Sequence, residues 1–452
     1  MDKMILYNHL PVPIQNLACS IEGYKIFKNR YTSYFWKCLE TYEELAKRSY
    51  DERCSYRDHR LNEMVQYCYS YIPYYRKIFD EGGINPNAIK SPNDLSVRPL
   101  LTKEEVRQDP ESFTPNGLAS DLKVITQHSS GTTGAGFVFN TTYEALSDQW
   151  ALWWRYRRGL GIPFSEPCAV FGGRPVIPPK KKTEPFYRIN KPNSQYMFSQ
   201  YHLNSSTISD YVKELRRIKV RWIHGYPSVL ALLAKFMVEH DITLSMDWVT
   251  TGAENLLDSQ KDIIEKAFGV RPYQHYGLSE AVANFSENID GEMYVDEEFS
   301  AVEFLPQKES EHFSVVGTTL NNFAMPLLRY VVNDEVDFKE TVKGRKIIAI
   351  DGRKEDYVVL SNGERVGRLD HLFKDSVNIR EAQIQQKIPG EIDILLNVNS
   401  DFNSRDEDFI RLEISSRMSG IKANFIYVDK IPRTKSGKLR LVVSDIREGK
   451  LD

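Results

Sequence analysis

Between residues 124 and 304, short apolar runs alternate with helical stretches, and this alternation limits the fold more than any other feature of the chain. The run at residues 169–171 predicts a strand, whereas Ile208–Ile218 predicts a helix. Strand, loop and helix in succession are typical of a parallel sheet with helices packed on it. Such sheets bind ligands beyond the carboxyl ends of their strands, so we expect functional loops at residues 225–228 and 273–280.

The spacing of apolar and aromatic residues is different on either side of this region. Residues 24–79 carry aromatic and charged side chains at helical spacing and predict amphipathic helices. Ser228 is a candidate cap for a further helix. After about Gly317 the apolar runs become short and close together, with a turn at Asn362-Gly363, which predicts a small α+β unit. The sequence therefore predicts an α/β protein with a domain boundary near Asp351-Gly352.

The composition argues against several classes of protein. With 452 residues, of which 41% are hydrophobic, the chain is expected to form two or three globular domains. Its net charge of -3 offers no basic field for nucleic acid. Five scattered cysteines without a CxxC pair argue against disulfides and a zinc site. The sequence shows no signal peptide and no apolar run long enough to span a bilayer, so we expect a cytoplasmic protein, with contact at a membrane surface left open.

A glycine-rich stretch reads SSGTTGAG from Ser129 to Gly136 and lies between the apolar segments at residues 124–126 and 137–139. Glycine has no Cβ, so such a loop can bring backbone N–H groups and hydroxyls close to a phosphate. No lysine follows the last glycine, which excludes the phosphate loop of the common nucleotide hydrolases. A phosphate cradle and a flexible hairpin turn both remain open from these residues alone.

Further polar segments follow in a fixed order along the chain. Tyr276-Gly277-Leu278-Ser279-Glu280 ends a strand-like segment with a carboxylate, and Asp334 follows another apolar run. Arg353 lies at the expected domain boundary, and a basic loop that contains Lys435 and Lys438 lies near the C-terminus. Taken singly, each of these is better explained as an ordinary surface charge or turn residue than as a functional residue.

Together and in this order, the motifs resemble those of the adenylate-forming superfamily, which includes acyl-CoA synthetases, luciferases and nonribosomal adenylation domains. The likeness is to the phenylacetate-CoA ligase-like branch, with the CapK-like proteins associated with capsular polysaccharide biosynthesis. It spans nearly the whole chain and includes Tyr74-Tyr75-Arg76, Asp94-Leu95, Pro99-Leu100-Leu101-Thr102-Lys103, His224-Gly225-Tyr226-Pro227-Ser228 and the final basic loop. The resemblance implies a large AMP-binding α/β domain over residues 1–354, mainly helical over residues 1–110, and a small mobile lid over residues 355–452.

This resemblance also implies an activity and the residues that carry it. A carboxylate would attack the α-phosphate of ATP, release pyrophosphate and form an acyl-adenylate, and the acyl group would then pass to coenzyme A or another acceptor. The residues that would surround the phosphates are Ser129, Ser130, Gly131, Thr132, Thr133 and Gly134. Those around the adenosine are Gly252, Ala253, Glu254, Tyr276, Gly277, Ser279, Asp334 and Arg353. Glu280 would bind Mg²⁺, Lys438 would be catalytic, and Glu355 would be the hinge.

The acid-binding pocket would lie, by analogy, near His224, Gly225, Tyr226 and His275. These histidines would favour a hydroxylated or charged acid, unless they are ordinary structural histidines. Two departures from the family pattern are Asn333 where glycine is usual and the glutamate at the hinge.

Three classes of function stay open: a carboxylate-activating ligase that uses coenzyme A or another acceptor, a nucleotidyl transferase that adenylylates a hydroxylated cofactor or sugar-linked acid, and a non-catalytic nucleotide-binding protein. A homodimer is also possible, because many relatives dimerise.

Overall fold

The computed structural model describes residues 3–117, 123–129, 137–178, 181, 183–204, 206–254, 256, 258–306, 312–350, 357–363, 365–366, 369–373, 378–398, 400–418, 420–429, 431–432 and 441–446. The chain divides into two compact units. The first comprises Met1–Ile125 and Asn140–Gly352, and the second comprises Thr126–Phe139 and Arg353–Asp452.

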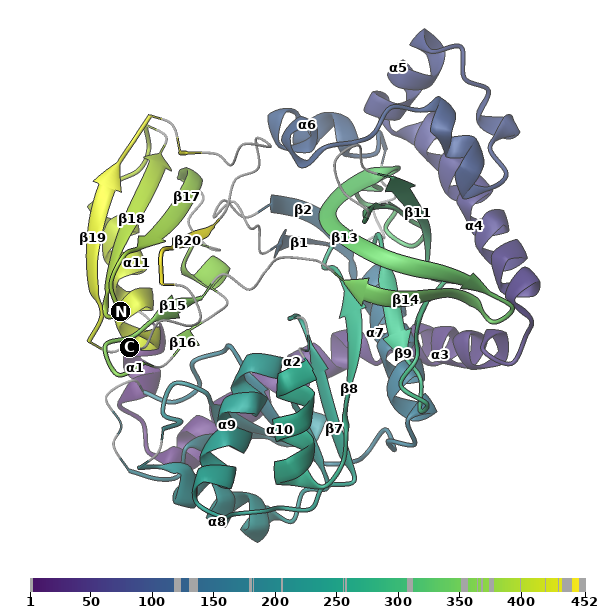
Figure 1. The fold of residues 1–452 in the computed structure, drawn as a ribbon. Coiled ribbons are helices and arrows are strands. Elements are labelled where there is room, and N and C mark those ends of the chain that lie inside the picture. The colour runs from purple at the N-terminus through teal and green to yellow at the C-terminus, as the bar shows by residue number, and fades with distance from the viewer. Residues whose placement is uncertain are drawn as a thin grey trace. The chain divides into compact units, whose positions relative to one another are not determined.

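The first unit is built on a sheet of twelve strands, of which one half is largely parallel (Figure 1). Neighbouring strands β5, β3, β6, β7 and β8 run parallel, and β4 pairs antiparallel with β5 at the edge. Their bounds are β3 Cys168–Gly172, β4 Tyr187–Asn190, β5 Gln195–Ser199, β6 Trp222–Gly225, β7 Trp248–Gly252 and β8 Pro272–Gly277.

Beyond β8 the same sheet continues with antiparallel strands. In spatial order these are β9 Asn284–Glu287, β10 Met293–Val295, β14 Gly344–Ile350, β13 Tyr330–Thr341, β12 Phe313–Thr319 and β11 Ser300–Pro306. The sheet therefore changes from parallel to antiparallel at β8, which has a parallel neighbour on one side and an antiparallel neighbour on the other.

Both faces of the parallel half are covered, as the side chains of its strands show. On one face, Ala169 and Phe171 pack into a core with the helices α8 (Ile208–Ile218), α9 (Pro227–Glu239) and α10 (Asp258–Phe268), which Figure 1 shows together beside β7. On the other face, Cys168 joins a second core with α3 (Ser33–Leu45) and α7 (Tyr143–Gly159). Successive strand residues point to opposite faces, so apolar residues fill both cores.

The N-terminal part is helical, with α1 Lys3–Asn8, α2 Val12–Arg30, α3, α4 Tyr50–Tyr71, α5 Pro73–Glu81 and α6 Lys103–Gln108. Caps begin several of these helices: Ser49 and Thr102 each form a capping box with a glutamate three residues later. The expectation of amphipathic helices over residues 24–79 is confirmed.

The second unit holds a four-stranded sheet in the order β19-β18-β17-β20. Its elements are β17 Ile379–Gln386, β18 Glu391–Val398, α11 Ser404–Arg417, β19 Lys422–Tyr427 and β20 Val442–Ser444. The strands β15 (Val358–Val359) and β16 (Arg365–Val366) form a hairpin on either side of the expected Asn362-Gly363 turn, where Gly363 has a φ of 84°. The strands β1 (Val124–Ser129) and β2 (Phe137–Thr142) form a separate two-stranded sheet.

The α/β fold class is confirmed, and helix α8 has the predicted bounds. The expected cap at Ser228 is wrong by two residues: α9 begins at Pro227, and Tyr226 is its N-cap residue. Proline suits the first helical position because its missing N–H has no partner there in any case.

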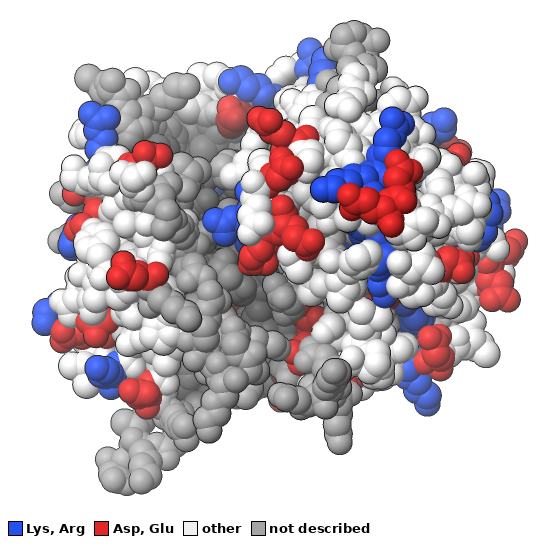
Figure 2. Space-filling view, turned by 90° about the horizontal axis from the view of Figure 1, so that it is seen from above, with Lys and Arg blue, Asp and Glu red and all other residues white. Residues whose placement is uncertain are grey.

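Among the described helices, none is long and apolar enough to span a bilayer. On the face in Figure 2, the described acidic and basic side chains are interspersed.

Candidate functional site

Four neighbouring parallel strands each end on a glycine. Strands β3, β6, β7 and β8 end at Gly172, Gly225, Gly252 and Gly277, and their carboxyl ends lie along one edge of the sheet. A Cβ on Gly225 would lie 2.8 Å from the carbonyl oxygen of Phe171, and one on Gly252 would lie 2.9 Å from Cε1 of His275. At Gly225 and Gly252 glycine is needed, because these two strand ends pack too closely for a side chain. This edge is where open α/β sheets bind their ligands.

Two of the expected adenosine ligands meet at this edge. The hydroxyl of Tyr276, in β8, donates a 2.7 Å hydrogen bond to the carboxylate of Asp334, in β13. The Tyr276 ring also stacks on Phe285, with 4.6 Å between the ring centroids. Asp334 is only 4% exposed, so its carboxylate is held in a mostly buried position. The two residues are 58 positions apart in the sequence.

The loop after β8 carries Glu280 and is held from two sides. Gln149 of α7 donates a 2.7 Å hydrogen bond to the carbonyl of Leu278, and the Ala281 N–H closes a 3.1 Å turn to the same carbonyl. Burial raises the pKa of Tyr330, and the negative charge of Glu280 raises it further. Ser279 is exposed in this loop. The loop therefore holds a carboxylate near the end of β8.

Glu280 offers one carboxylate, whose oxygen atoms are the ligands that a cation such as Mg²⁺ prefers. Within the described ranges, His, Cys, Asp and Glu side chains form no group of three or more that could hold a metal ion. Mg²⁺ commonly binds proteins through one or two carboxylates and takes its other ligands from substrate phosphates and water. The donor chemistry of Glu280 fits that ion.

The segment after β7 has a strained backbone. Ala253 is exposed and has a φ of 68°, in the left-handed region that residues with a Cβ rarely adopt. Glu254 follows it and is half-buried. Strain of this kind is concentrated at binding sites, which agrees with the expected place of both residues beside a ligand.

His224 is uncharged, and its side chain contacts the neighbouring strand of the sheet. Its Nδ1 lies 3.0 Å from the Thr250 hydroxyl, which also accepts a 2.8 Å hydrogen bond from the Trp222 indole. Burial lowers the pKa of His224 well below its usual value, and the positive charge of Arg157 lowers it further. This contact fits the structural-histidine interpretation of His224.

His275 lies between aromatic rings on the side of the sheet that α7 covers. Its ring centroid is 5.4 Å from that of Trp153 and 5.3 Å from that of Tyr156. Burial, followed by the charge of Arg157, lowers the pKa of His275 to about 3. Both histidines are therefore uncharged near neutral pH and offer no positive charge to an acid.

Tyr226 lies beside the end of β3. A Cβ on Gly173 would lie 3.0 Å from the Tyr226 hydroxyl, and the Tyr201 hydroxyl donates a hydrogen bond to the Gly173 carbonyl. Of the expected pocket residues, Gly225 and Tyr226 lie at the end of β6, and His275 lies in β8, on the other side of β7.

Several expected residues lie outside the described ranges: Ser130, Gly131, Thr132, Thr133, Gly134, Arg353, Glu355 and Lys438. Ser129 is the last residue of β1. The structure therefore brings together the expected adenosine and pocket residues of the first unit. Sequence reasoning missed Trp153, Arg157 and Thr250, which surround the histidines from other elements and belong to no motif.

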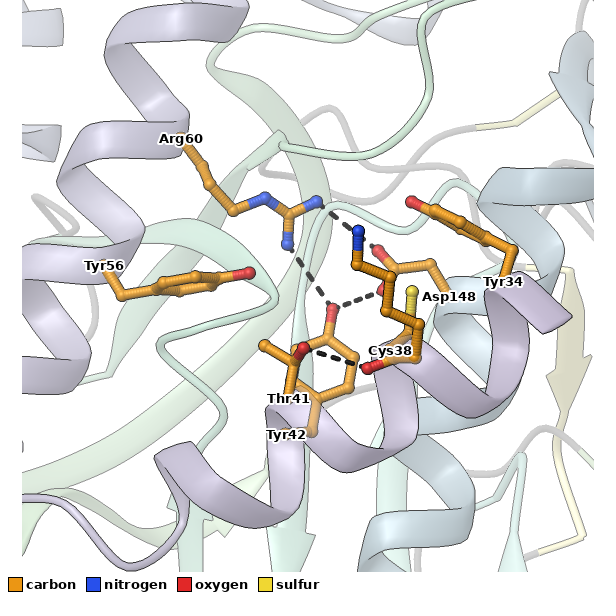
Figure 3. A pocket seen from close by; sticks show the side chains of 8 residues that line it. Tyr34, Cys38, Thr41, Tyr42, Tyr56, Arg60 and Asp148 are labelled. Atoms are coloured by element: carbon orange, nitrogen blue, oxygen red, sulfur yellow. Dashed lines mark hydrogen bonds and ion pairs between the residues drawn. The ribbon is translucent and has the colours of Figure 1, made fainter.

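A separate pocket of about 210 Å³ lies between α3, α4 and α7 (Figure 3). Its buried Asp148 accepts hydrogen bonds from Tyr42 at 2.7 Å and Asn321 at 3.0 Å, and it lies 3.5 Å from Arg60. Burial, and then Asp148, raise the pKa of Cys38 to about 12, so the sulfur stays a thiol. The buried polar groups of this pocket are paired with one another, as expected for a structural joint between helices.

Comparisons with known proteins agree with the geometry. Residues 358–445 match the family of CapK C-terminal domains. The protein CapK of Staphylococcus aureus is 26% identical over 98% of this chain and 99% of its own length. The phenylacetate-coenzyme A ligase of Escherichia coli K12 is 24% identical over 75% of this chain and 77% of its own.

Solved structures share the fold. A 2-hydroxyisobutyryl-CoA ligase, in complex with 2-HIB-AMP and CoA in the thioesterification state, matches 88% of this chain and 90% of its own. Its TM-score is 0.56 at 18% sequence identity. The same ligase in its postadenylation state has a TM-score of 0.53.

Proposed function

We propose that this chain, which is similar to CapK and to the phenylacetate-CoA ligases, activates a small carboxylic acid with ATP and passes the acyl group to coenzyme A or another acceptor. The observation that carries the proposal is the hydrogen bond between Tyr276 and Asp334, at the edge of the sheet where four strands end on glycine. The fold of the CoA ligases supports it.

The proposed reaction has two steps. A carboxylate oxygen of the acid attacks the α-phosphorus of ATP, the bond to the bridging oxygen breaks, and pyrophosphate leaves. The thiol sulfur of coenzyme A then attacks the acyl carbon, its proton passes to solvent, and AMP leaves. Negative charge gathers on phosphoryl oxygens in the first step, so positioned donors and cations lower the barrier.

Residue roles follow from chemistry and from the family likeness. Asp334 accepts hydrogen bonds from the ribose hydroxyls, and Tyr276 orients its carboxylate. Residues 252–254 and Tyr276 line the adenine. Glu280 would hold Mg²⁺, which would supply positive charge to neutralise the phosphates. The loop from Ser129 to Gly134 surrounds the outer phosphates, Arg353 supports the ribose, and Lys438 supplies positive charge at the α-phosphate. Movement of residues 355–452 about Glu355 belongs to the same proposal.

The acid pocket is proposed at Tyr226 and His275, with His224 behind them. Since both histidines are neutral, they favour an acid with hydroxyl groups over one with a second negative charge. The likeness to CapK supports a role in polysaccharide biosynthesis. A cytoplasmic location stays a prediction.

The decisive experiment is ATP–pyrophosphate exchange with a panel of hydroxylated acids. We expect Lys438→Ala to lower exchange by roughly a hundredfold or more, because one charge that stabilises the transition state is lost. Lys435→Ala, in the same basic loop, is the matched control and should keep wild-type exchange. Exchange at the wild-type rate in Lys438→Ala would contradict the assignment of that lysine.

Product analysis then tests the class of reaction. Mass spectrometry should detect free AMP, pyrophosphate and a thioester when coenzyme A is present. AMP retained on the final product would instead indicate a nucleotidyl transferase.

A further inference from the structure

Arg157 is a buried positive charge that no described carboxylate neutralises. Only 5% of this residue of α7 is exposed. Its guanidinium carbon lies 5.4, 5.2 and 5.5 Å from the ring centroids of Trp150, Trp154 and Trp222. Within the part of the chain that the structure describes, its side chain forms no hydrogen bond or ion pair, and its Nε is buried without a partner. Burying a charge is costly, and the faces of aromatic rings compensate only part of that cost.

Arg30 and Arg174 bring two further positive charges to the same place. The guanidinium carbon of Arg30, at the end of α2, lies 3.5 Å from the ring centroid of Trp150, the ring that Arg157 also approaches. Burial lowers the pKa of Arg30, an effect that Tyr31 opposes. The positive charges of Arg157 and Arg174 lower the pKa of Arg30 further, which requires the three guanidinium groups to lie near one another. Neither Arg30 nor Arg174 is in an ion pair with any carboxylate among the described residues.

The ionisable groups around Arg157 are uncharged. Burial raises the pKa of Tyr156 and that of Cys168, so the phenol and the thiol keep their protons. Burial lowers the pKa of both His224 and His275, and the charge of Arg157 lowers both further, so the two imidazoles are neutral. The three arginines, Arg30, Arg157 and Arg174, therefore form a cluster of positive charge that its neighbours leave without compensation.

Arg174 places this arginine cluster beside the expected acid pocket. It follows the end of β3 by two residues, and a Cβ on the intervening Gly173 would lie 3.0 Å from the Tyr226 hydroxyl. Strands β6 and β7 lie between β3 and β8, the strand that carries Tyr276. Arg174 therefore lies on the side of the pocket away from the proposed adenosine contact, where the far end of a bound acid would lie.

The chemistry of the cluster indicates what that end of the acid carries. Guanidinium groups bind oxyanions, because their N–H donors match two oxygen atoms of a carboxylate or a phosphate. The neutral histidines offer hydrogen bonds to hydroxyl groups but no charge, so an anionic group binds at the arginines and not at the histidines. On the basis of the ligase function above, we propose that Arg30, Arg157 and Arg174 bind a second oxyanion of the acid, at the end away from the carboxylate that attacks ATP.

Calorimetric titration of the full chain tests this site with pairs of acids that differ in one group. The pairs are malate with 2-hydroxybutyrate, 2-hydroxyglutarate with 2-hydroxyvalerate, and 2-hydroxyadipate with 2-hydroxyhexanoate, in which a methyl replaces the second carboxylate. A fourth pair, 3-phosphoglycerate with glycerate, tests phosphate. The titrations contain α,β-methylene-ATP, from which pyrophosphate cannot leave. In at least one pair the acid with the second anionic group should bind roughly tenfold tighter or more, since a charge-assisted hydrogen bond is added. Equal affinity within every pair would overturn the proposal.

Two arginine variants connect the preference to the cluster. Arg157→Met and Arg174→Met keep much of the side-chain length without the charge, and each should reduce the preference to about threefold or less. Arg158→Met is the matched control, because Arg158 is the next residue of α7, is 43% exposed and pairs with Glu43. It should keep the wild-type preference. A preference that survives in both Arg157→Met and Arg174→Met would assign the anionic group to another site.

Urea unfolding separates binding from a structural role of Arg157. Arg157→Met removes an uncompensated buried charge, so its unfolding midpoint without acid should equal or exceed that of the wild type. A lower midpoint would show that the contacts with the tryptophans hold the fold, and would overturn the assignment of Arg157 to a ligand.

Pyrophosphate exchange with the same pairs separates this inference from the proposed function. Exchange that is as fast with the uncharged partner as with the anionic acid in every pair would overturn the inference and leave the ligase function standing. Arginine-dependent binding of an anionic acid without any exchange would keep the oxyanion site and contradict the ligase function.

Discussion

Burial decides the charge of the two histidines near the strand ends. His224 and His275 carry pKa values below the ordinary range because they lie within the packed first unit and near Arg157. A histidine in a sequence gives no sign of this, since the cause is the burial of its ring and a charge from another element. Tyr276 and Asp334 were predictable from motifs, but their hydrogen bond was not, because 58 residues separate them.

The low pKa of His275 makes stability depend on pH. Between pH 6.5, where an unfolded histidine titrates, and about 3, the unfolded chain binds a proton that the folded chain does not. Acid therefore favours unfolding, and this one group lowers the free energy of unfolding by up to about 1.4 kcal/mol per pH unit in that window. His275→Gln removes this contribution. The difference in the free energy of unfolding between this variant and the wild type should therefore narrow as pH falls from 7 to 5. Urea unfolding at several pH values measures it.

The exposed His59, whose side chain is 75% exposed, supplies the control. His59→Gln should leave the pH dependence of unfolding unchanged. A constant difference in unfolding free energy between His275→Gln and the wild type across this range would show that the pKa of His275 is the same in the folded and unfolded chains, against this prediction.

At the scale of elements, the sequence predicted helix bounds best where its apolar residues recur with a clear helical period. Helix α8 begins and ends where its spacing predicted, whereas α9 begins one residue before the predicted cap. The glycine ends of β3, β6, β7 and β8 are visible in the sequence, but their alignment on one edge depends on which strands pair. Strand pairing is a long-range choice that single segments do not encode.

Gly317 lies where β12 packs closely against the segment that follows Glu280. In β12, its Cα faces the backbone carbonyl of Val282, two residues after Glu280, and a Cβ there would overlap that carbonyl. Gly317→Ala should cost roughly 1–3 kcal/mol of unfolding free energy. It should also lower pyrophosphate exchange, because the loop that carries Glu280 must shift. Chemical denaturation and the exchange assay measure the two effects.

Gly159→Ala is the matched control. Gly159 ends α7 with open space around its Cα, so alanine there should be neutral or stabilise by up to about 1 kcal/mol. Equal effects of the two substitutions would contradict the packing argument.

At the scale of the whole first unit, buried ion pairs join segments from distant parts of the sequence. Glu297 accepts hydrogen bonds of 2.7 and 2.8 Å from Arg345 of β14 and also pairs with Arg57 of α4. Nearby, Arg155 of α7 pairs with Asp296 and Glu298. These ion pairs thus link the helical N-terminal part to the antiparallel strands. Because the charges are buried, leaving one of them unpaired would cost stability.

Glu297→Gln should be strongly destabilising for this reason. It leaves two buried arginines without their shared counter-charge, which costs on the order of 3–5 kcal/mol. Thermal and urea unfolding of the full chain measure the loss. Glu292→Gln removes a partner of Lys346 at a more exposed site and should change stability little, so a large effect there would weaken the argument from burial.

The sequence by itself determined the α/β class, many helices and strands, and the likeness to the adenylate-forming superfamily, because periodicity and ordered motifs are local signals that survive without coordinates. The tertiary structure decided which of the motif residues meet. It placed Tyr276 against Asp334, aligned four glycine strand ends and removed the charge from His224 and His275. The physical reason is that pairing, burial and electrostatic environment depend on residues far apart in the chain, and these become neighbours only when the chain folds.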